Sequence, residues 1–315
     1  MNNLIISYFP ILLITVISFF LCIFFKLQDK NKIINLFYQQ KVFLSGGFFF
    51  YITFLYYYTN LNLYLFIFLS ALLLIGLLDD KYDLKVSTRF IFTFISILFF
   101  LILENNYITY FSFVSNGSLI INLILTSVCI LGFLHMTNMS DGKNGHLMTY
   151  FVLILCFFFY KLEFYNNDHF LHFVLISSIW FLVLNLLNLS QLGNSGVIVI
   201  SLIFYFLIQT YYKLEFISEI DIFVFFSFLL FDGIRVSSIR IFNGRSPFTK
   251  DLLHLHFLVK KWYIGYSIIF LNYIMLLIIY FNFDFFFYFD MLICLFLYIN
   301  VLFLSKLLNR NSLLT

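Results

Sequence analysis

The sequence predicts an all-α polytopic integral membrane protein, and three observations support this prediction. Hydrophobic residues make up 63% of the 315 residues, and the mean hydropathy is +1.01. A soluble domain is roughly 45–50% apolar, so this composition excludes a soluble fold, and it excludes disorder as well. Charged residues form only 10% of the chain, and they gather between long apolar runs.

Eleven apolar runs follow one another along the chain. About 20 apolar residues cross the hydrocarbon core as an α-helix, which satisfies its own backbone hydrogen bonds. We expect a single transmembrane domain over residues 1–315, with helices near 4–25, 42–59, 61–78, 89–103, 118–136, 146–162, 170–187, 195–212, 217–233, 263–282 and 286–305. The first run lacks a basic leader and an Ala-x-Ala site, so we interpret it as a span and not as a signal peptide.

The cysteines add no covalent framework to this fold. The chain has four, and each lies inside an apolar run: Cys22, Cys129, Cys156 and Cys294. A disulfide scaffold is therefore excluded, and we interpret the cysteines as packing residues.

The basic residues predict the orientation of the helices. All but two of the 18 Lys and Arg residues fall in one set of loops, and the exceptions are Lys161 and Lys213. Basic residues concentrate on the cytoplasmic side, so we expect the N-terminus outside and the C-terminus in the cytoplasm. Apart from His172, near an outer end, the spans are almost bare of ionisable groups, which disfavours a transporter with polar groups at the midplane.

The first polar cluster runs from Gly76 to Arg89 and contains the adjacent pair Asp79 and Asp80. A solvated loop of mixed charge is one interpretation. The other is a carboxylate pair that binds a divalent cation or orients a phosphate, since Mg²⁺ usually takes one or two carboxylates together with substrate phosphates.

The second and third clusters lie in loops on the same predicted side. His135 to His146 contains Asn138 and Asp141, which are three residues apart and would share a face at a helix end. Asn188 to Gly196 contains two glycines and could place a helix N-terminus against a phosphate. Ordinary turns rich in Asn, Asp and Gly remain the alternative for both segments.

The fourth cluster, Asp232 to Phe257, combines cations with a histidine pair. Arg235, Arg240 and Arg245 form a predicted cationic wall suited to a diphosphate. His254 and His256 could bind a metal or a phosphate, although a zinc site is disfavoured because no cysteine is near. The alternative is a basic loop that anchors to anionic lipid.

Together the clusters resemble the motifs of the polyprenyl-phosphate N-acetylhexosamine-1-phosphate transferases, glycosyltransferase family 4. The resemblance is closest to the undecaprenyl-phosphate GlcNAc-1-phosphate transferase branch. Gly76 to Asp80 matches Gly-x-x-Asp-Asp, and Asn138 to Gly145 matches Asn-x-x-Asp-Gly-x-x-Gly, with His135 in the position of a preceding Asn. Gly193 to Gly196 matches Gly-Asp-x-Gly with Asn194 for the Asp, and Ser246 to Phe257 matches the closing Ser-Pro-Phe and His-x-His-His loop with Phe257 for the last His.

The resemblance implies a reaction at the cytoplasmic face of a bacterial inner membrane. The phosphate of polyprenyl phosphate would attack the β-phosphorus of a UDP-amino sugar such as UDP-GlcNAc. UMP would leave, and the lipid-linked sugar would start a surface polysaccharide, lipopolysaccharide or cell-wall glycan. Mg²⁺, or Mn²⁺ in its place, would reduce the repulsion between the two anions. No nucleic-acid partner is implied, and a homodimer is left open.

The resemblance also implies roles for individual residues. Asp79 and Asp80 would orient or deprotonate the lipid phosphate, and Asn138 and Asn194 would hold the metal. The substrate-binding residues would be Asp141 and Asn144 near the nucleotide, and Arg245, His254 and His256 at the sugar diphosphate. Because Asn194 stands where the family has an aspartate, an alternative function is that of a divergent, weakly active or inactive relative that binds the lipid or partner proteins.

Overall fold

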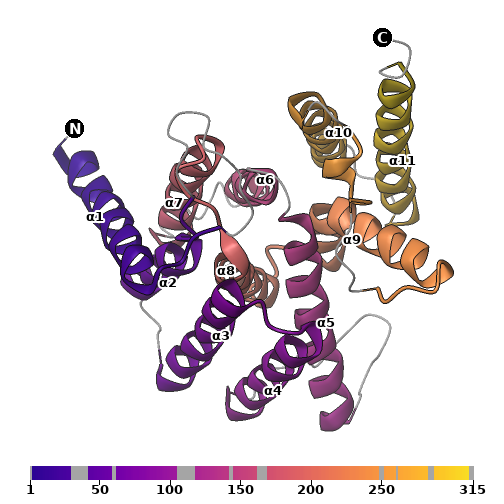
Figure 1. Cartoon of the computed structure of the whole chain (residues 1–315). Coiled ribbons are helices and arrows are strands. Elements are labelled where there is room, and N and C mark those ends of the chain that lie inside the picture. The colour runs from indigo at the N-terminus through magenta and orange to yellow at the C-terminus, as the bar shows by residue number, and fades with distance from the viewer. Residues whose placement is uncertain are drawn as a thin grey trace. The chain divides into compact units, whose positions relative to one another are not determined.

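The computed structural model describes residues 2–29, 42–58, 62–104, 118–141, 145–161, 169–247, 252–259, 262–282 and 287–311. Within these ranges the chain forms eleven α-helices and one short 3-10 helix, η1 (Figure 1). Their bounds are α1 Asn2–Phe25, α2 Gly46–Tyr57, α3 Leu63–Tyr82, α4 Val86–Glu104, α5 Leu119–Ser140, α6 His146–Lys161, α7 His169–Leu186, α8 Gly193–Lys213, α9 Glu219–Phe242, η1 Leu255–Phe257, α10 Trp262–Asn282 and α11 Phe287–Asn311. The predicted all-α fold class and the eleven helices are confirmed.

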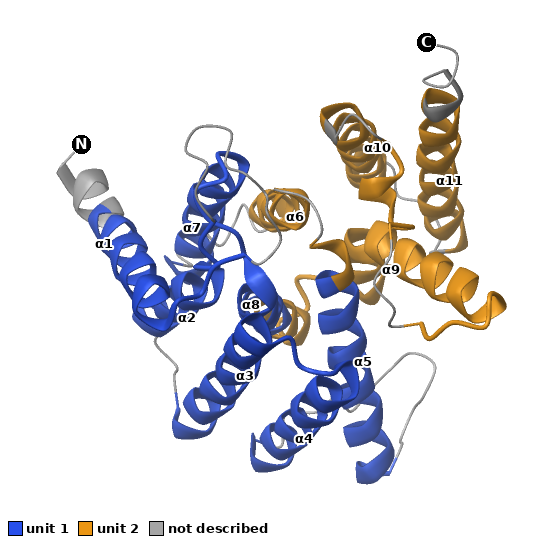
Figure 2. Ribbon diagram, in the orientation of Figure 1, with its two compact units in different colours: residues 1–138, 167–206 blue, residues 139–166, 207–315 orange. Residues whose placement is uncertain are grey.

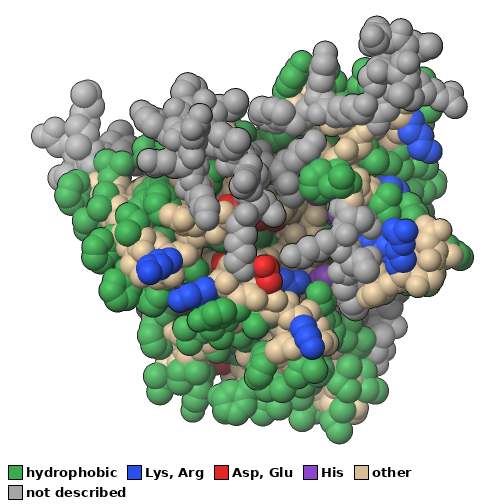
Figure 3. All heavy atoms as spheres, viewed as in Figure 1, with side chains coloured by type: hydrophobic (Ala, Val, Ile, Leu, Met, Phe, Trp, Pro, Cys, Tyr) green, Lys and Arg blue, Asp and Glu red, His purple; other side chains and the backbone are tan. Residues whose placement is uncertain are grey.

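Eight of the described helices are long and apolar enough to cross a membrane, namely α3, α4, α5, α7, α8, α9, α10 and α11. Residues 9–25 of α1 and all of α6 form shorter apolar helices. Large apolar side chains remain exposed on the long helices. In α4, for example, Phe92 and Phe99 are 54% and 61% exposed. Hydrophobic side chains are exposed over large parts of the face seen in Figure 3. These features are those of a multi-pass membrane protein.

The predicted span at 42–59 is wrong in its extent. Helix α2 has 12 residues, and at 1.5 Å per residue it is about 18 Å long, which is short of the roughly 30 Å hydrocarbon core. Residues 42–45 lie outside the helix, and Phe43 among them forms isolated bridges with Gln28 and Ser190. Phe49, Phe50 and Phe54 of α2 are buried in the core. The run is apolar because it packs inside the protein. Hydropathy alone does not distinguish such buried residues from residues that contact lipid.

The chain divides into two compact units (Figure 2). Unit 1 comprises residues 1–138 and 167–206, and unit 2 comprises residues 139–166 and 207–315. In unit 1, α2 packs against α1, α3 and α7, and α3 packs against α4. In unit 2, α10 packs against α6, α9, α11 and η1.

Candidate functional site

The candidate site in unit 1 begins with Asp80 near the C-terminal end of α3. Its carboxylate receives three hydrogen bonds from the first turn of α8. The backbone N–H of Asn194 donates to Oδ1 at 2.6 Å, and the N–H and hydroxyl of Ser195 donate to Oδ2 at 3.1 and 2.6 Å. The first N–H groups of a helix have no partner within the helix, and a carboxylate there also interacts favourably with the helix dipole. Asp80 therefore caps α8 from a different helix.

Glycines allow the first turn of α8 to lie directly against α2 and α3. A Cβ atom added to Gly76 of α3 would lie 2.5 Å from the Cα of Ser195, and one added to Gly46 of α2 would lie 2.6 Å from the Cα of Leu192. Both obstructions are backbone atoms, so a larger side chain at either glycine would force the helices apart. Gly46 also donates its N–H to the carbonyl of Gln191 at 3.2 Å.

Asp79, the neighbour of Asp80, contacts a different element. One Nη atom of Arg89 in α4 lies 2.5 Å from its Oδ2, and the N–H of Leu84 donates to its Oδ1 at 2.9 Å. Helix α3 ends two residues after this pair, at Tyr82, where Asp83 adopts a left-handed conformation with φ of 52°. Asp79 thus fixes the short turn that leads from α3 into α4. Both aspartates are buried, with 3% and 7% exposure.

A pocket lies beside this turn, within unit 1. Apolar side chains of α4, α5 and α8 form much of its wall, and the polar side chains of Arg89, Thr93, His135 and Asn138 interrupt it. The full lining consists of Val86, Arg89, Phe90, Thr93, Leu131, Leu134, His135, Asn138 and Ile198. The pocket can therefore accept a mainly apolar group that carries a polar or anionic end.

Asn194 is related to this pocket by helix geometry. It lies four residues before Ile198 in α8, and positions four apart share a helix face. Asn194 is half-buried, as is Asn138, which lines the pocket itself. Carboxylate and amide oxygens suit a hard cation such as Mg²⁺. In the described residues, no three His, Cys, Asp or Glu side chains are placed to hold a metal ion by themselves.

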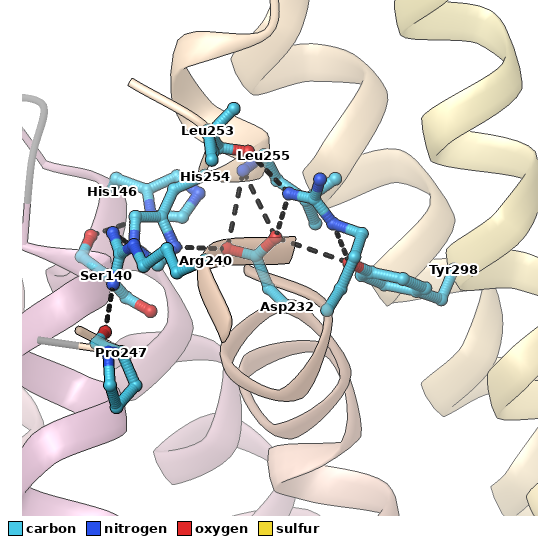
Figure 4. Close-up of polar contacts among 10 residues, drawn as sticks. Ser140, His146, Asp232, Arg240, Pro247, Leu253, His254, Leu255 and Tyr298 are labelled. Carbon is cyan, nitrogen blue, oxygen red and sulfur yellow. Dashed lines mark hydrogen bonds and ion pairs between the residues drawn. The ribbon is translucent and has the colours of Figure 1, made fainter. Parts of the chain in front are cut away.

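Unit 2 contains a second polar centre around Asp232 of α9 (Figure 4). Its Oδ1 lies 2.7 Å from Nη2 of Arg235 and accepts the Tyr298 hydroxyl at 3.2 Å, while its Oδ2 accepts Nδ1 of His254 at 2.8 Å. The N–H of Leu255 lies 3.3 Å from both oxygens. These contacts fasten the segment before and within η1 to α9 and α11.

Three histidines of unit 2 lie in a row. The ring centroid of His256 is 4.8 Å from that of His146 and 5.7 Å from that of His254. Nδ1 of His146 lies 3.1 Å from the carbonyl oxygen of Ser140 (Figure 4). All three rings are buried, with 3–4% exposure. The row therefore joins the start of α6 to the loop that precedes α10.

The predicted cationic wall of the fourth cluster differs from what the structure shows. Arg235 is bound to Asp232 and to the Leu253 carbonyl, while Arg240 is 2% exposed and donates to the Pro247 carbonyl at 2.5 Å. Both guanidinium groups stabilise unit 2 from within, and Arg245 is exposed. Sequence spacing alone could not reveal that an acid three residues before Arg235 would neutralise it.

The predicted site residues fall into both units. Asp79, Asp80, Asn138 and Asn194 belong to unit 1, and the structure brings the first two and the backbone of Asn194 together. Asp141, Arg245, His254 and His256 belong to unit 2, where the two histidines adjoin. Asn144 lies outside the described residues.

Three residues that build the two polar centres were not among the predicted site residues, namely Arg89, Ser195 and Asp232. Each lies inside one of the four clusters, so the clusters carried the only signal that could have found them.

Comparison with known proteins finds a family match for part of the chain. Residues 62–208 match the model of glycosyl transferase family 4, a stretch that contains the acid pair, Asn138 and the start of α8. This stretch of the chain is similar to glycosyl transferase family 4. No curated protein matches the chain.

Proposed function

We propose that the protein transfers an N-acetylhexosamine-1-phosphate from a UDP-sugar to undecaprenyl phosphate or another polyprenyl phosphate. The family match supports the general reaction class, and the pocket of unit 1 is the observation that carries the proposal further. Its mainly apolar wall suits an isoprenoid chain, and its polar side chains suit the phosphate at the end of that chain.

Arg89 is the group that we assign to the acceptor phosphate. A guanidinium has five N–H donors and pairs well with phosphate oxygens. Contact with Asp79 engages one Nη atom, so other donors can reach a phosphate in the pocket. Asp79 in turn holds the guanidinium at the pocket wall and limits how strongly Arg89 binds an anion.

The chemistry on the acceptor side is a displacement at phosphorus. An oxygen of the acceptor phosphate forms a bond to the β-phosphorus of the UDP-sugar, and the bond from that phosphorus to the bridging oxygen breaks, so that UMP leaves with the electron pair. Little covalent assistance is needed from the protein, whose task is to position two anions and stabilise the charge that develops. Asp79 lies where it can orient the acceptor through Arg89.

The amide oxygens of Asn138 and Asn194 suit a hard cation, and we assign these two residues to the metal. Mg²⁺, or Mn²⁺ in its place, would supply charge neutralisation to the diphosphate when bound. On the donor side, we assign Asp141 and Asn144 to the nucleotide, and Arg245, His254 and His256 to the sugar diphosphate. The buried Asp232 fixes the orientation of His254 through its Nδ1 atom.

The same proposal places the protein in a bacterial inner membrane, with its N-terminus outside and its C-terminus in the cytoplasm. It would start a surface polysaccharide or another lipid-linked glycan. A UDP-amino sugar and the polyprenyl lipid would be its partners, and a homodimer is compatible with this role.

The direct test is UMP release by the full-length protein in vesicles that contain undecaprenyl phosphate and Mg²⁺, with UDP-GlcNAc and related UDP-sugars as donors. We expect turnover with at least one donor. Arg89→Gln should raise the KM for the lipid by about ten-fold or more, since a hydrogen bond to a charged group contributes at least that factor. Lys81→Gln is the matched control, because Lys81 is an exposed cation in the last turn of α3, on the other side of the turn that leads into α4. Absence of UMP release with every donor would contradict the proposal.

A second candidate function rests on Asn194, which is neutral where the family pattern has an aspartate. The protein would then bind the lipid or partner proteins with weak or no turnover. Asn194→Asp separates the two functions. A large gain in UMP release would indicate a damaged metal site in the native chain, whereas an unchanged high rate would show that the amide suffices.

A further inference from the structure

The geometry of α3 points to different tasks for the two adjacent aspartates. We infer that Asp80 is a positioning residue, which fixes the first turn of α8 and with it Asn194, while Asp79 is the acid of the pair that acts at the acceptor pocket through Arg89. The part of this inference that concerns turnover rests on the proposed function.

The direction of the two side chains is the first argument. Successive residues of an α-helix are about 100° apart around its axis. Asp79 accordingly contacts Arg89 of α4, and Asp80 contacts the start of α8. Two carboxylates that are neighbours in sequence therefore belong to two different sets of contacts.

The second argument is the hydrogen bonding of Asp80. Both of its oxygens accept donors from α8, and one of them accepts two. Gly193, with φ of 67°, brings the chain so close that an added Cβ would lie 2.9 Å from Oδ2 of Asp80. A carboxylate held in this way cannot approach a substrate phosphate without giving up the cap of α8.

The third argument is the rigidity of the surroundings. Gly76 and Gly46 let α3 and α2 meet the backbone of this turn, and Ser45 and Ser190 join their hydroxyls beside it. The turn is held on one side by glycine packing and on the other by Asp80. Because Asn194 shares a helix face with Ile198 of the pocket wall, fixing the turn fixes the place of Asn194 relative to the pocket.

Hydrogen exchange of the full-length protein tests the positioning role without reference to activity. In wild-type protein the amides of Asn194 and Ser195 should exchange slowly. Asp80→Asn should speed their exchange by about ten-fold or more, since bonds to a charged acceptor are lost. Ser195→Ala removes one of the three bonds and should have a smaller effect in the same direction, and Asp79→Asn should leave these amides unchanged.

Turnover of the same variants separates positioning from direct chemistry. Ser195→Ala leaves the Asp80 carboxylate in place, so it should lower UMP release only if order in α8 matters, and in proportion to the lost protection. Asp79→Asn should impair use of the lipid to about the extent that Arg89→Gln does, with protection intact. Loss of turnover in Asp80→Asn with unchanged exchange, or full turnover in Ser195→Ala with faster exchange, would overturn the inference.

Failure of the proposed function is a distinct outcome. If wild-type protein releases no UMP from any donor, the reaction is wrong, and the exchange rates still decide whether Asp80 anchors α8. If Asp80→Asn does not fold, Ser195→Ala provides the same comparison with a milder change.

Discussion

Units 1 and 2 each bury an aspartate within a polar centre, but the partners differ in kind. Asp80 in unit 1 accepts only from backbone N–H groups and a hydroxyl among its described contacts. Asp232 in unit 2 accepts from a guanidinium and an imidazole as well as from neutral groups. The Asp80 centre relies on the close approach of backbones, whereas the Asp232 centre relies on opposite charge. The first arrangement should be sensitive to shape and the second to the removal of charge.

Removal of the acid from unit 2 should have the largest effect. Asp232→Ala leaves the Arg235 guanidinium without its counterion and breaks the contacts to His254 and Leu255. Breaking a buried pair in this way costs about 3–5 kcal/mol of unfolding free energy. Unfolding in mixed micelles measures the loss. The control is Glu215→Asn, a change at an exposed acid with φ of 60°, a conformation that Asn tolerates. A loss under about 1 kcal/mol would contradict the dependence of unit 2 on charge.

Adding a methyl group to a buried glycine should destabilise unit 1 more than unit 2. Gly76→Ala in unit 1 places a methyl group 2.5 Å from a backbone atom of α8, and overpacking of this kind costs about 1–3 kcal/mol. Gly265→Ala in unit 2 meets only the side chain of Val259, at 3.0 Å, so it should cost less. Gly132→Ala meets nothing within 4 Å and serves as the control. Equal losses of unfolding free energy for Gly76→Ala and Gly265→Ala would contradict the greater sensitivity of unit 1 to shape.

A second acid of unit 2 tests whether neutral partners can hold a carboxylate there too. Asp221 is fully buried and lies 2.5 Å from Lys161. It also accepts the Tyr280 hydroxyl at 2.8 Å and the Ser218 N–H at 2.6 Å. Lys161→Met would leave it with neutral partners, as Asp80 has. We expect a loss of about 1.5–3 kcal/mol, smaller than that of Asp232→Ala because three neutral donors remain. If Lys161→Met costs as much unfolding free energy as Asp232→Ala, unit 2 cannot hold a buried acid without a cation.

Single hydrogen bonds between helices should give the smallest effects, and similar ones in both units. Asn300 donates to Asn272 at 2.8 Å between α11 and α10 of unit 2, and the Tyr51 and Ser70 hydroxyls lie 2.6 Å apart between α2 and α3 of unit 1. Asn300→Leu and Tyr51→Phe should each cost about 0.6 kcal/mol, the average for such bonds in membranes. Unfolding in the same mixed micelles measures both losses of free energy. If the two losses differ by more than about 1 kcal/mol, the units differ also in the strength of single hydrogen bonds between helices.

Much of the fold followed from the sequence because the bilayer imposes a simple rule. Each long apolar run must form a helix to satisfy its backbone, so the succession of apolar runs predicted the eleven helices and the places where polar clusters interrupt them. The rule failed at residues 42–59, since burial inside a protein and exposure to lipid select the same apolar residues. Only the packing of Phe49 and Phe54 in the core revealed the difference.

The partners of the charged residues could not be predicted from the sequence. It identified Asp79 and Asp80 as a pair and Arg235 and Arg240 as a row of cations. Which side chain turns toward which helix depends on rotation about the helix axis and on contacts between segments over a hundred residues apart, as between Asp80 and Ser195. The sequence by itself thus determined a helical membrane protein with clustered polar motifs. The tertiary structure decided which of those motifs hold the helices together and which line a pocket, because hydrogen bonds and close packing are fixed only when the helices meet.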